Sequence, residues 1–281
     1  LDTLEAEVEF VTDASTRAAL RFRMAELLRG PLREPDRAIA VYEASLDDDP
    51  THAGSLAALE AIAQDPSSAE RREAARAAAP HYEALARYDK LLAMLELLAQ
   101  TDDPIEKLAA LRRAAQIAEH GQHDSALALS YLGRALALAS EHESLPELLG
   151  DYAQLAQATG RYAEYVTCLS ELAPHVLDPE QRVRVYQDIA TIAHEKLADV
   201  ALARSAYRKA LEEQPEDMAL LDALVELDTA AGDHAALIDV LGRKASLVLD
   251  AKQRALLLER QADVYERGLD DAAHAITALE D

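Results

Sequence analysis

The sequence predicts an all-α protein, an α-solenoid superhelix of about seven stacked antiparallel helix hairpins. Three observations support this prediction: an internal repeat of 72 residues, apolar residues at helical spacing between turn residues, and a composition that is half apolar but has no Trp and only two Phe. Such a composition favours many thin helices over one thick core. Hairpins of this kind cannot bury their apolar faces alone, so they stack on their neighbours.

The repeat consists of identical residues at a fixed distance. Arg182, Ala190, Asp199 and Ala203 return 72 residues later as Arg254, Ala262, Asp271 and Ala275. The intervening half returns too, as Leu148, Leu155, Gly160 and Leu169 recur as Leu220, Leu227, Gly232 and Leu241. A unit of this length holds about four amphipathic helices, which make two hairpins. We therefore expect residues 1–281 to form a single array.

The clearest unit runs from Asp178 to Leu249. Asp178 followed by Pro179 predicts a helix start, because the acid can cap the helix and proline fixes a helical φ. Helical spacing then predicts two helices before Pro215, where proline cannot continue the hydrogen-bond ladder. Apolar residues predict two more helices on either side of Gly232. This unit therefore contains two helical hairpins.

The packing residues of this unit resemble the tetratricopeptide repeat (TPR) signature, in which small residues admit the second helix and proline ends the unit. The matching residues are Ile189, Ala190, Ala203, Tyr207, Ala210 and Pro215. A first copy has Met24, Ala25, Ala38, Tyr42, Ser45 and Pro50. A third copy, with Ala114, Ala115, Ala128, Leu132 and Ala135, lacks the aromatic residue and the proline. The hairpins of these copies carry one residue more than the family pattern, near Lys196 in the clearest copy.

The repeat is irregular between Ala63 and Tyr88. The spacing there stretches to roughly 90 residues, enough for one additional helix. We expect an irregular extra helix near residues 66–80, with a short charged helix over 69–79 that Pro80 ends or kinks. Two interpretations stay open: drift between repeats, or a functional insertion.

The two ends of the sequence align with the interior of hairpins. Leu4 and Val8 correspond to Leu241 and Ala245, and Leu279 corresponds to Tyr207. Neither end has the polar cap of a free-standing array. We expect a fragment of a longer array; frayed native ends are the alternative.

Charge and composition exclude several classes of function. A formal net charge of -24 argues against a nucleic-acid partner, because phosphate binding needs clustered Lys and Arg. No apolar run of eighteen residues exists to span a membrane, and the first ten residues are acidic and amphipathic, unlike a signal peptide. We expect a cytoplasmic protein. Cys168 is the single cysteine, and its apolar setting predicts a buried filler.

The sequence contains no recognisable enzyme motif, so we expect no catalytic, cofactor-binding or metal-binding residues. His120, His123 and Asp124 come nearest to a metal site, but we interpret them as residues of a turn, with Asp124 capping the next helix. Acidic pairs at the turns, such as Asp47–Asp49 and Glu212–Glu213, are also interpreted as caps. The alternative is that they form acidic edges that attract a basic partner or weakly hold divalent cations.

In the TPR family, the first helix of each hairpin lines a concave groove that binds partners. The resemblance places the following residues on that face: Phe22, Glu26, Arg29, Arg112, Gln116, Glu119, Gln154, Gln157, Arg184, Gln187, Thr191, Asp222, Glu226, Glu259, Asp263 and Glu266. This face becomes more acidic toward the C-terminal end. We therefore expect a basic or amphipathic peptide or helix as ligand.

Together these features predict a non-catalytic protein–protein interaction scaffold. One alternative is an architectural spacer in a long repeat protein. Another is a regulatory domain attached to an enzyme module outside this chain. A groove of one sign or of apolar character would favour ligand binding, whereas self-paired charges would favour the spacer. The sequence makes no prediction about the oligomeric state.

Overall fold

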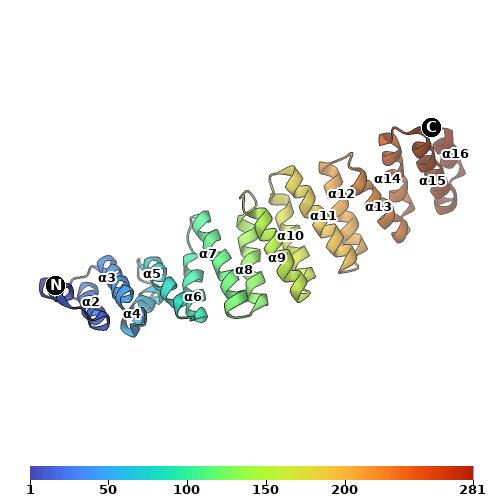
Figure 1. Ribbon diagram of the computed structural model, residues 1–281. Coiled ribbons are helices and arrows are strands. Elements are labelled where there is room, and N and C mark those ends of the chain that lie inside the picture. Colours follow the sequence, from blue (N-terminus) through green and yellow to red (C-terminus); the bar gives the residue numbers. More distant parts are fainter. Residues whose placement is uncertain (281) are drawn as a thin grey trace. The chain divides into compact units, whose positions relative to one another are not determined.

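The computed structural model describes residues 1–280, and these residues form helices joined by short turns, without a strand (Figure 1). The first eight α-helices are α1 (Asp2–Phe10), α2 (Ala14–Arg29), α3 (Pro35–Asp48), α4 (Ala53–Gln64), α5 (Arg71–Ala84), α6 (Tyr88–Leu98), α7 (Pro104–Gln116) and α8 (Ser125–Leu138). The next eight are α9 (Leu145–Thr159), α10 (Tyr162–Leu172), α11 (Pro179–Glu195), α12 (Val200–Glu213), α13 (Met218–Ala231), α14 (His234–Leu247), α15 (Ala251–Leu269) and α16 (Ala272–Glu280). The predicted all-α class is confirmed.

The chain divides into two compact units. The first comprises residues 1–139 and 146–155, and the second comprises residues 140–145 and the chain from residue 156 onwards. Hairpins in which neighbouring helices pack on each other lie within the first unit as α2/α3, α5/α6 and α7/α8, and within the second as α11/α12, α13/α14 and α15/α16. The predicted stack of helix hairpins is therefore present in each unit. That residues 1–281 form a single array stays a prediction.

Small residues at the predicted positions bring paired helices together. In the α11/α12 hairpin, Ala190 and Ala203 are fully buried. In the α2/α3 hairpin, Ala25, Ala38 and the ring of Tyr42 are buried in the same way. Because small side chains leave room for a facing helix, these residues allow close helix packing. The packing implied by the resemblance to the TPR signature is confirmed in both copies.

A left-handed residue marks the turn inside many of the hairpins. Arg33, His123, Ala198 and Asp270 have positive φ values of 57°, 55°, 54° and 56°. At each turn, the amide of the next residue donates to a carbonyl six residues earlier, as Asp199 does to Ala193 at 2.8 Å. This left-handed turn accommodates the extra residue by which these hairpins depart from the family pattern.

The irregular region differs in detail from the prediction. Helix α5 begins at Arg71 instead of residue 69, and it continues past Pro80 to Ala84. The helix survives the proline because both sides of it are packed: Ala78 is fully buried, and Tyr82 donates a hydrogen bond to Glu60 of α4 at 3.0 Å. Three helices (α4, α5 and α6) therefore lie between α3 and α7.

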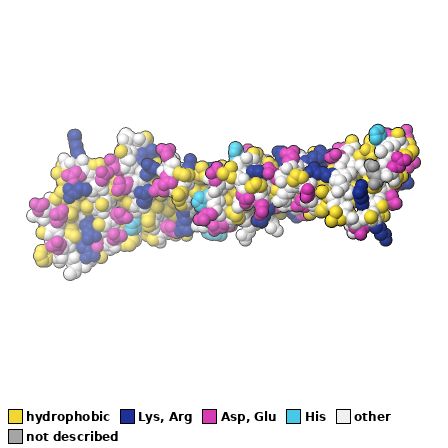
Figure 2. All heavy atoms as spheres, turned by 90° about the horizontal axis from the view of Figure 1, so that it is seen from above, with side chains coloured by type: hydrophobic (Ala, Val, Ile, Leu, Met, Phe, Trp, Pro, Cys, Tyr) yellow, Lys and Arg dark blue, Asp and Glu magenta, His cyan; other side chains and the backbone are white. Residues whose placement is uncertain are grey.

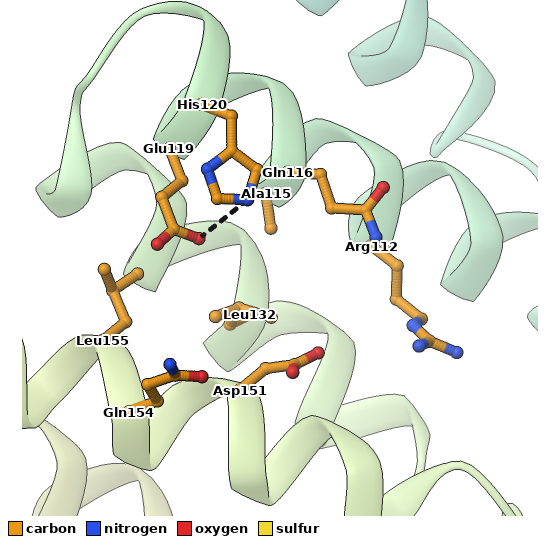
Figure 3. A pocket seen from close by; sticks show the side chains of 9 residues that line it. All are labelled: Arg112, Ala115, Gln116, Glu119, His120, Leu132, Asp151, Gln154 and Leu155. Atoms are coloured by element: carbon orange, nitrogen blue, oxygen red, sulfur yellow. Dashed lines mark ion pairs between the residues drawn. The ribbon is translucent and has the colours of Figure 1, made fainter.

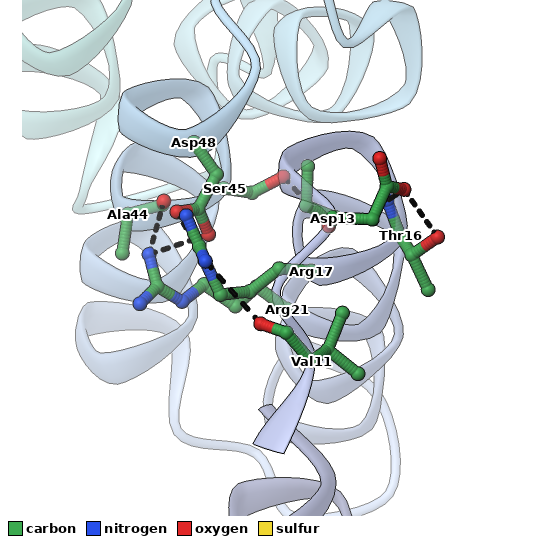
Figure 4. Close-up of polar contacts among 9 residues, drawn as sticks. Val11, Asp13, Thr16, Arg17, Arg21, Ala44, Ser45 and Asp48 are labelled. Atoms are coloured by element: carbon green, nitrogen blue, oxygen red, sulfur yellow. Dashed lines mark hydrogen bonds and ion pairs between the residues drawn. The ribbon is translucent and has the colours of Figure 1, made fainter. Parts of the chain in front are cut away.

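Not all of the acidic residues at turns are caps. Asp103, Asp217 and Asp271 do accept hydrogen bonds from the first amides of the following helices, as predicted. Asp48 instead pairs with two arginines of α2, at 2.6 Å from Arg17 and 2.8 Å from Arg21 (Figure 4). These ion pairs join the end of α3 to the start of α2, so the carboxylate stabilises the hairpin rather than the next helix.

Candidate partner-binding surfaces

The predicted groove residues lie on first helices of the hairpins and on the turn that follows α7. Phe22, Glu26 and Arg29 belong to α2, Arg112 and Gln116 to α7, Glu119 to the turn after α7, and Gln154 and Gln157 to α9. Arg184, Gln187 and Thr191 belong to α11, Asp222 and Glu226 to α13, and Glu259, Asp263 and Glu266 to α15. None of these side chains is fully buried, so all are available at the surface of their own unit.

A cavity of about 300 Å³ in the first unit brings four of these residues together. Arg112, Gln116, Glu119 and Gln154 line it, although they come from segments up to 42 residues apart in the sequence (Figure 3). Its other lining residues are Ala115, His120, Leu132, Asp151 and Leu155. We name it the α7/α9 cavity.

The α7/α9 cavity combines an apolar floor with polar walls. Ala115, Leu132 and Leu155 are 3–5% exposed and pack beneath it. The amides of Gln116 and Gln154 come from different helices, and each can donate and accept a hydrogen bond. A peptide backbone carries the same two kinds of group, so the cavity has the chemistry to hold a polypeptide segment.

Charge in the α7/α9 cavity is predominantly negative. Arg112 pairs with Glu147, with 2.7 Å between the guanidinium and the carboxylate. Glu119 and Asp151 remain as carboxylates on the lining. His120 lies 3.9 Å from Glu119 and adds a positive charge only when it is protonated. The lining therefore favours a cationic group on a ligand.

A turn of π-helix positions Glu119 and His120. Helix α7 passes into this turn over Ile117–Gly121, and single π-turns are frequent at functional sites. Gly121 is required there, because a Cβ atom at this residue would lie 2.8 Å from the ring of Tyr88. His120 is predicted as a turn residue, and neither it nor Asp151 is among the residues predicted for the groove. Asp151 could have been found by helical spacing, since it precedes Gln154 by one turn.

A second cavity, of about 530 Å³, lies in the second unit between α15 and α16. The predicted residues Glu259, Asp263 and Glu266 line it on the α15 side. Ala262 of α15 and four residues of α16, namely Ala272, Ala275, Ile276 and Leu279, complete the lining. The α16 residues are not among those predicted for the groove, because the TPR resemblance places only first helices there. We name it the α15/α16 cavity.

Two of the predicted groove residues on α2, Phe22 and Glu26, contact side chains of the protein itself. The ring of Phe22 packs against those of Tyr42 and His52, with centroids 5.9 and 5.3 Å apart. Glu26 accepts a hydrogen bond from the Tyr42 hydroxyl. Burial and the Glu26 carboxylate raise the pKa of Tyr42, which stays protonated. These contacts stabilise the α2/α3 hairpin.

The remaining predicted residues line neither of these two cavities. Asp222 forms an ion pair with Lys244, and the Thr191 hydroxyl lies 3.4 Å from that of Tyr207. Gln157, Arg184, Gln187 and Glu226 lie on helix faces outside both. Figure 2 shows carboxylates and cations interspersed over the visible face.

Residues 1–280 offer neither a metal site nor a membrane span. Within that range, no three His, Cys, Asp or Glu side chains are grouped so that they could hold a metal ion. No helix described there has the length and apolar character needed to cross a bilayer.

A scan against protein-family models finds no match, and neither does a search of curated proteins. Solved structures similar to the chain include PilF of Pseudomonas aeruginosa, with 21% identity, a TM-score of 0.34, and coverage of 74% of this chain and 90% of that one. TPR-like repeats of a kinesin light chain from Podospora anserina have 17% identity, a TM-score of 0.31, and coverage of 70% and 96%. The TPR2AB domain of yeast Sti1, in a complex with pHSP90, has 13% identity, a TM-score of 0.28, and coverage of 90% and 99%. The helix pairing and buried small residues described above give the chain a TPR-like helical-repeat fold.

Proposed function

We propose that this chain is a non-catalytic protein-interaction scaffold and that the α7/α9 cavity holds a peptide segment of its partner. The observation that carries the proposal is the meeting of four predicted groove residues (Arg112, Gln116, Glu119 and Gln154) around one cavity. Packed helices form the walls, so binding orders little of the scaffold itself. The scaffold acts by presenting a rigid, preformed surface to its partner.

The lining indicates which peptides fit. Gln116 and Gln154 can hydrogen-bond to the backbone of an extended segment, and the floor around Leu132 accepts a small apolar side chain. Glu119 and Asp151 favour Lys or Arg on the ligand, since Arg112 is already paired with Glu147. A basic or amphipathic peptide is therefore the preferred ligand.

Selection from a random peptide library on the full chain tests this proposal. Selected peptides should be enriched in Lys and Arg, and their affinities, measured by fluorescence anisotropy, should fall at least about tenfold in the Gln116→Ala/Gln154→Ala double variant and in Asp151→Lys. Ser130→Ala, a change at an exposed residue of α8 outside the cavity and outside the predicted groove, is the matched control. Peptides that bind all of these variants equally well would contradict the proposal.

A second candidate function, the architectural spacer, is favoured by one specific observation. Charges pair between each helix and the next but one, as in Lys90–Glu60 (α6/α4), Arg113–Glu83 (α7/α5) and Arg134–Glu96 (α8/α6), so these charged groups already have partners within the protein. A spacer would select no peptide. Enrichment of peptides that bind the full chain would therefore count against the spacer.

A further inference from the structure

One position on the second helix carries a tyrosine in two copies of the repeat and a leucine in the third. The residues are Tyr42 in α3, Tyr207 in α12 and Leu132 in α8. Each of them follows a fully buried alanine by four positions, as Leu132 follows Ala128, so the three residues occupy the same place on their helices. The α7/α8 hairpin therefore lacks a ring that the α2/α3 and α11/α12 hairpins contain.

In those two hairpins the tyrosine extends from the second helix to the first. The Tyr42 ring is fully buried, and its hydroxyl donates a hydrogen bond to Glu26. The Tyr207 hydroxyl lies 3.4 Å from that of Thr191. Glu26 and Thr191 each precede their tyrosine by 16 residues. A tyrosine at this position therefore places its ring between the two helices and its oxygen beside one fixed residue of the first helix.

The α7/α9 cavity lies where the absent ring would stand. Gln116 precedes Leu132 by 16 residues, so it occupies the position of Glu26 and Thr191. Leu132 and Gln116 both line the cavity (Figure 3). A leucine has neither the ring nor the hydroxyl that join the two positions in the other hairpins. The cavity therefore contains the space that a tyrosine side chain would fill from within the chain.

The lining offers each part of a tyrosine side chain a suitable contact. The floor of Ala115, Leu132 and Leu155 is apolar and suits the faces of a ring. The side-chain oxygen of Gln116 accepts a hydrogen bond from Arg113 at 3.1 Å, so its NH2 group remains to donate to a phenol oxygen. A small apolar side chain would cover the floor but has no group that can bond to this amide. A tyrosine therefore fits the cavity better.

We propose that the partner peptide carries a tyrosine whose side chain fills the α7/α9 cavity, as Tyr42 and Tyr207 fill the same space in their own hairpins. This inference rests on the proposed function, because it requires the cavity to hold a peptide. The ring packs on the floor and the hydroxyl bonds to Gln116, while a neighbouring Lys or Arg of the peptide lies near Glu119 and Asp151. A buried tyrosine is a frequent anchor in protein interfaces.

Peptides selected from a random library on the full chain give the first test. They should share a tyrosine next to Lys or Arg. Replacing that tyrosine by alanine should weaken binding at least about tenfold in fluorescence anisotropy, and replacing it by phenylalanine should weaken binding about threefold or more. The tyrosine and phenylalanine peptides should bind equally well to Gln116→Ala, because the amide that bonds to the hydroxyl is then absent.

Restoring the tyrosine in the chain gives the second test. In Leu132→Tyr the new ring should occupy the cavity, so the selected peptides should bind at least about tenfold more weakly. Ala137→Tyr adds the same ring at an exposed residue of α8 outside the cavity, and it should bind the peptides like the unchanged chain. The melting temperature of Leu132→Tyr, measured by circular dichroism, should not fall, because the ring fills existing space.

Failure of this inference differs from failure of the proposed function. Selected peptides that depend on Gln154 and Asp151 but share no tyrosine would overturn this inference alone. Undiminished peptide binding to a folded Leu132→Tyr variant would do the same. A Leu132→Tyr variant that unfolds or has a lower melting temperature would also overturn it, since the cavity would then not fit the ring. If the library yields no binding peptide, the proposed function and this inference both fail.

Discussion

Arg182 at the start of α11 holds Glu213 at the end of α12 with two parallel hydrogen bonds. Its Nε and Nη2 atoms donate to Oε1 and Oε2 at 2.7 and 2.8 Å. Its Nη1 atom donates to the carbonyl of Val176 at 2.6 Å. One guanidinium therefore ties together both helices of the hairpin and the segment that precedes it. Such a bidentate pair is specific in geometry as well as in charge.

The α2/α3 hairpin contains the same device. Arg17 pairs with Asp48 at 2.6 Å and donates to the carbonyl of Val11 at 3.3 Å (Figure 4). In both hairpins the carboxylate follows the arginine by 31 residues, and the carbonyl precedes it by six. The recurrence indicates that the arginine sets the register between the two helices.

The first prediction concerns this arginine. Arg182→Ala and Glu213→Ala should each lower the melting temperature measured by circular dichroism, and the double variant should lose less than the sum of the two, because each single change already breaks the pair. The hydrogen bonds to Arg182 hold the pKa of Glu213 below its usual value. The decrease in melting temperature caused by each single change should be smaller in high salt, which screens the ion pair. Arg184→Ala, on the same helix, is the control. If the effects of the two single changes add up exactly in the double variant, the pair is energetically unimportant.

The second prediction concerns acid. Hydrogen bonds from Thr16, Arg182 and Arg204 lower the pKa values of Asp13, Glu213 and Asp233, respectively. A carboxyl group whose pKa is lower in the folded state stabilises the fold above its unfolded pKa of about 4, and this stabilisation is lost as the pH falls through the folded value.

At higher pH, repulsion among the excess negative charges opposes the stabilisation by the paired carboxylates. The charge of -24 is self-repulsive, so partial protonation between pH 7 and 5 should leave the melting temperature level or slightly raise it. Below about pH 4 the melting temperature should fall, because the paired carboxylates become protonated. Thermal denaturation at constant ionic strength measures both ranges, and a melting temperature that keeps rising down to pH 3 would contradict the prediction.

The helices and most of their ends could be predicted from the sequence because they depend on local interactions. Asp178 and Pro179 begin α11, and Gly232 ends α13 in the left-handed conformation, as the capping and turn patterns predict. Helix α5 does not end at Pro80, which was one of the two predicted outcomes, because tertiary packing of the neighbouring residues outweighs the local effect of a proline. The interpretation of Asp48 and Glu213 as caps is wrong, since they bind arginines that are 27 to 31 residues away in sequence.

The candidate sites were only partly predictable. The TPR resemblance identified Gln116 and Gln154 on separate helices, but that they line one cavity depends on how successive hairpins stack. The π-turn that carries His120 into this cavity has no clear signal in composition or spacing. Ile276 lies on a second helix, whereas the TPR resemblance places only first helices in the groove, so this lining residue could not be predicted.

The third prediction concerns close helix packing. Ala190 and Ala203 are both fully buried, so Ala190→Arg or Ala203→Arg must force a long charged side chain between α11 and α12. We expect a loss of about 3 kcal/mol or more in the free energy of unfolding. Urea denaturation measures it, with the exposed Ala201→Arg as control. Full helicity and an unchanged unfolding midpoint in either buried variant would show that the repeat register is wrong.

The fourth prediction concerns the thiol of Cys168. Burial, with a smaller effect of Glu171, raises the pKa of this thiol to about 11. At pH 8 the fraction present as thiolate should then be about a hundredfold or more below that of a free cysteine. Reaction with a chromogenic disulfide reagent should be slow in the native chain and fast in urea. Equal rates in the two states would mean that the thiol is not shielded.

The last prediction concerns the left-handed turns. Ala198 has a φ of 54°, which brings its Cβ atom close to the following carbonyl and is unfavourable for every residue except glycine. Ala198→Gly should therefore raise the free energy of unfolding by about 0.5–1 kcal/mol, after the greater chain entropy of glycine in the unfolded state is subtracted. Gly232→Ala is the reciprocal control: φ is 66° and no atom lies within 4 Å of the added Cβ, so backbone strain alone should destabilise it by about 1 kcal/mol. If Ala198→Gly is destabilising while Gly232→Ala is neutral, the left-handed turn does not carry the strain assigned to it.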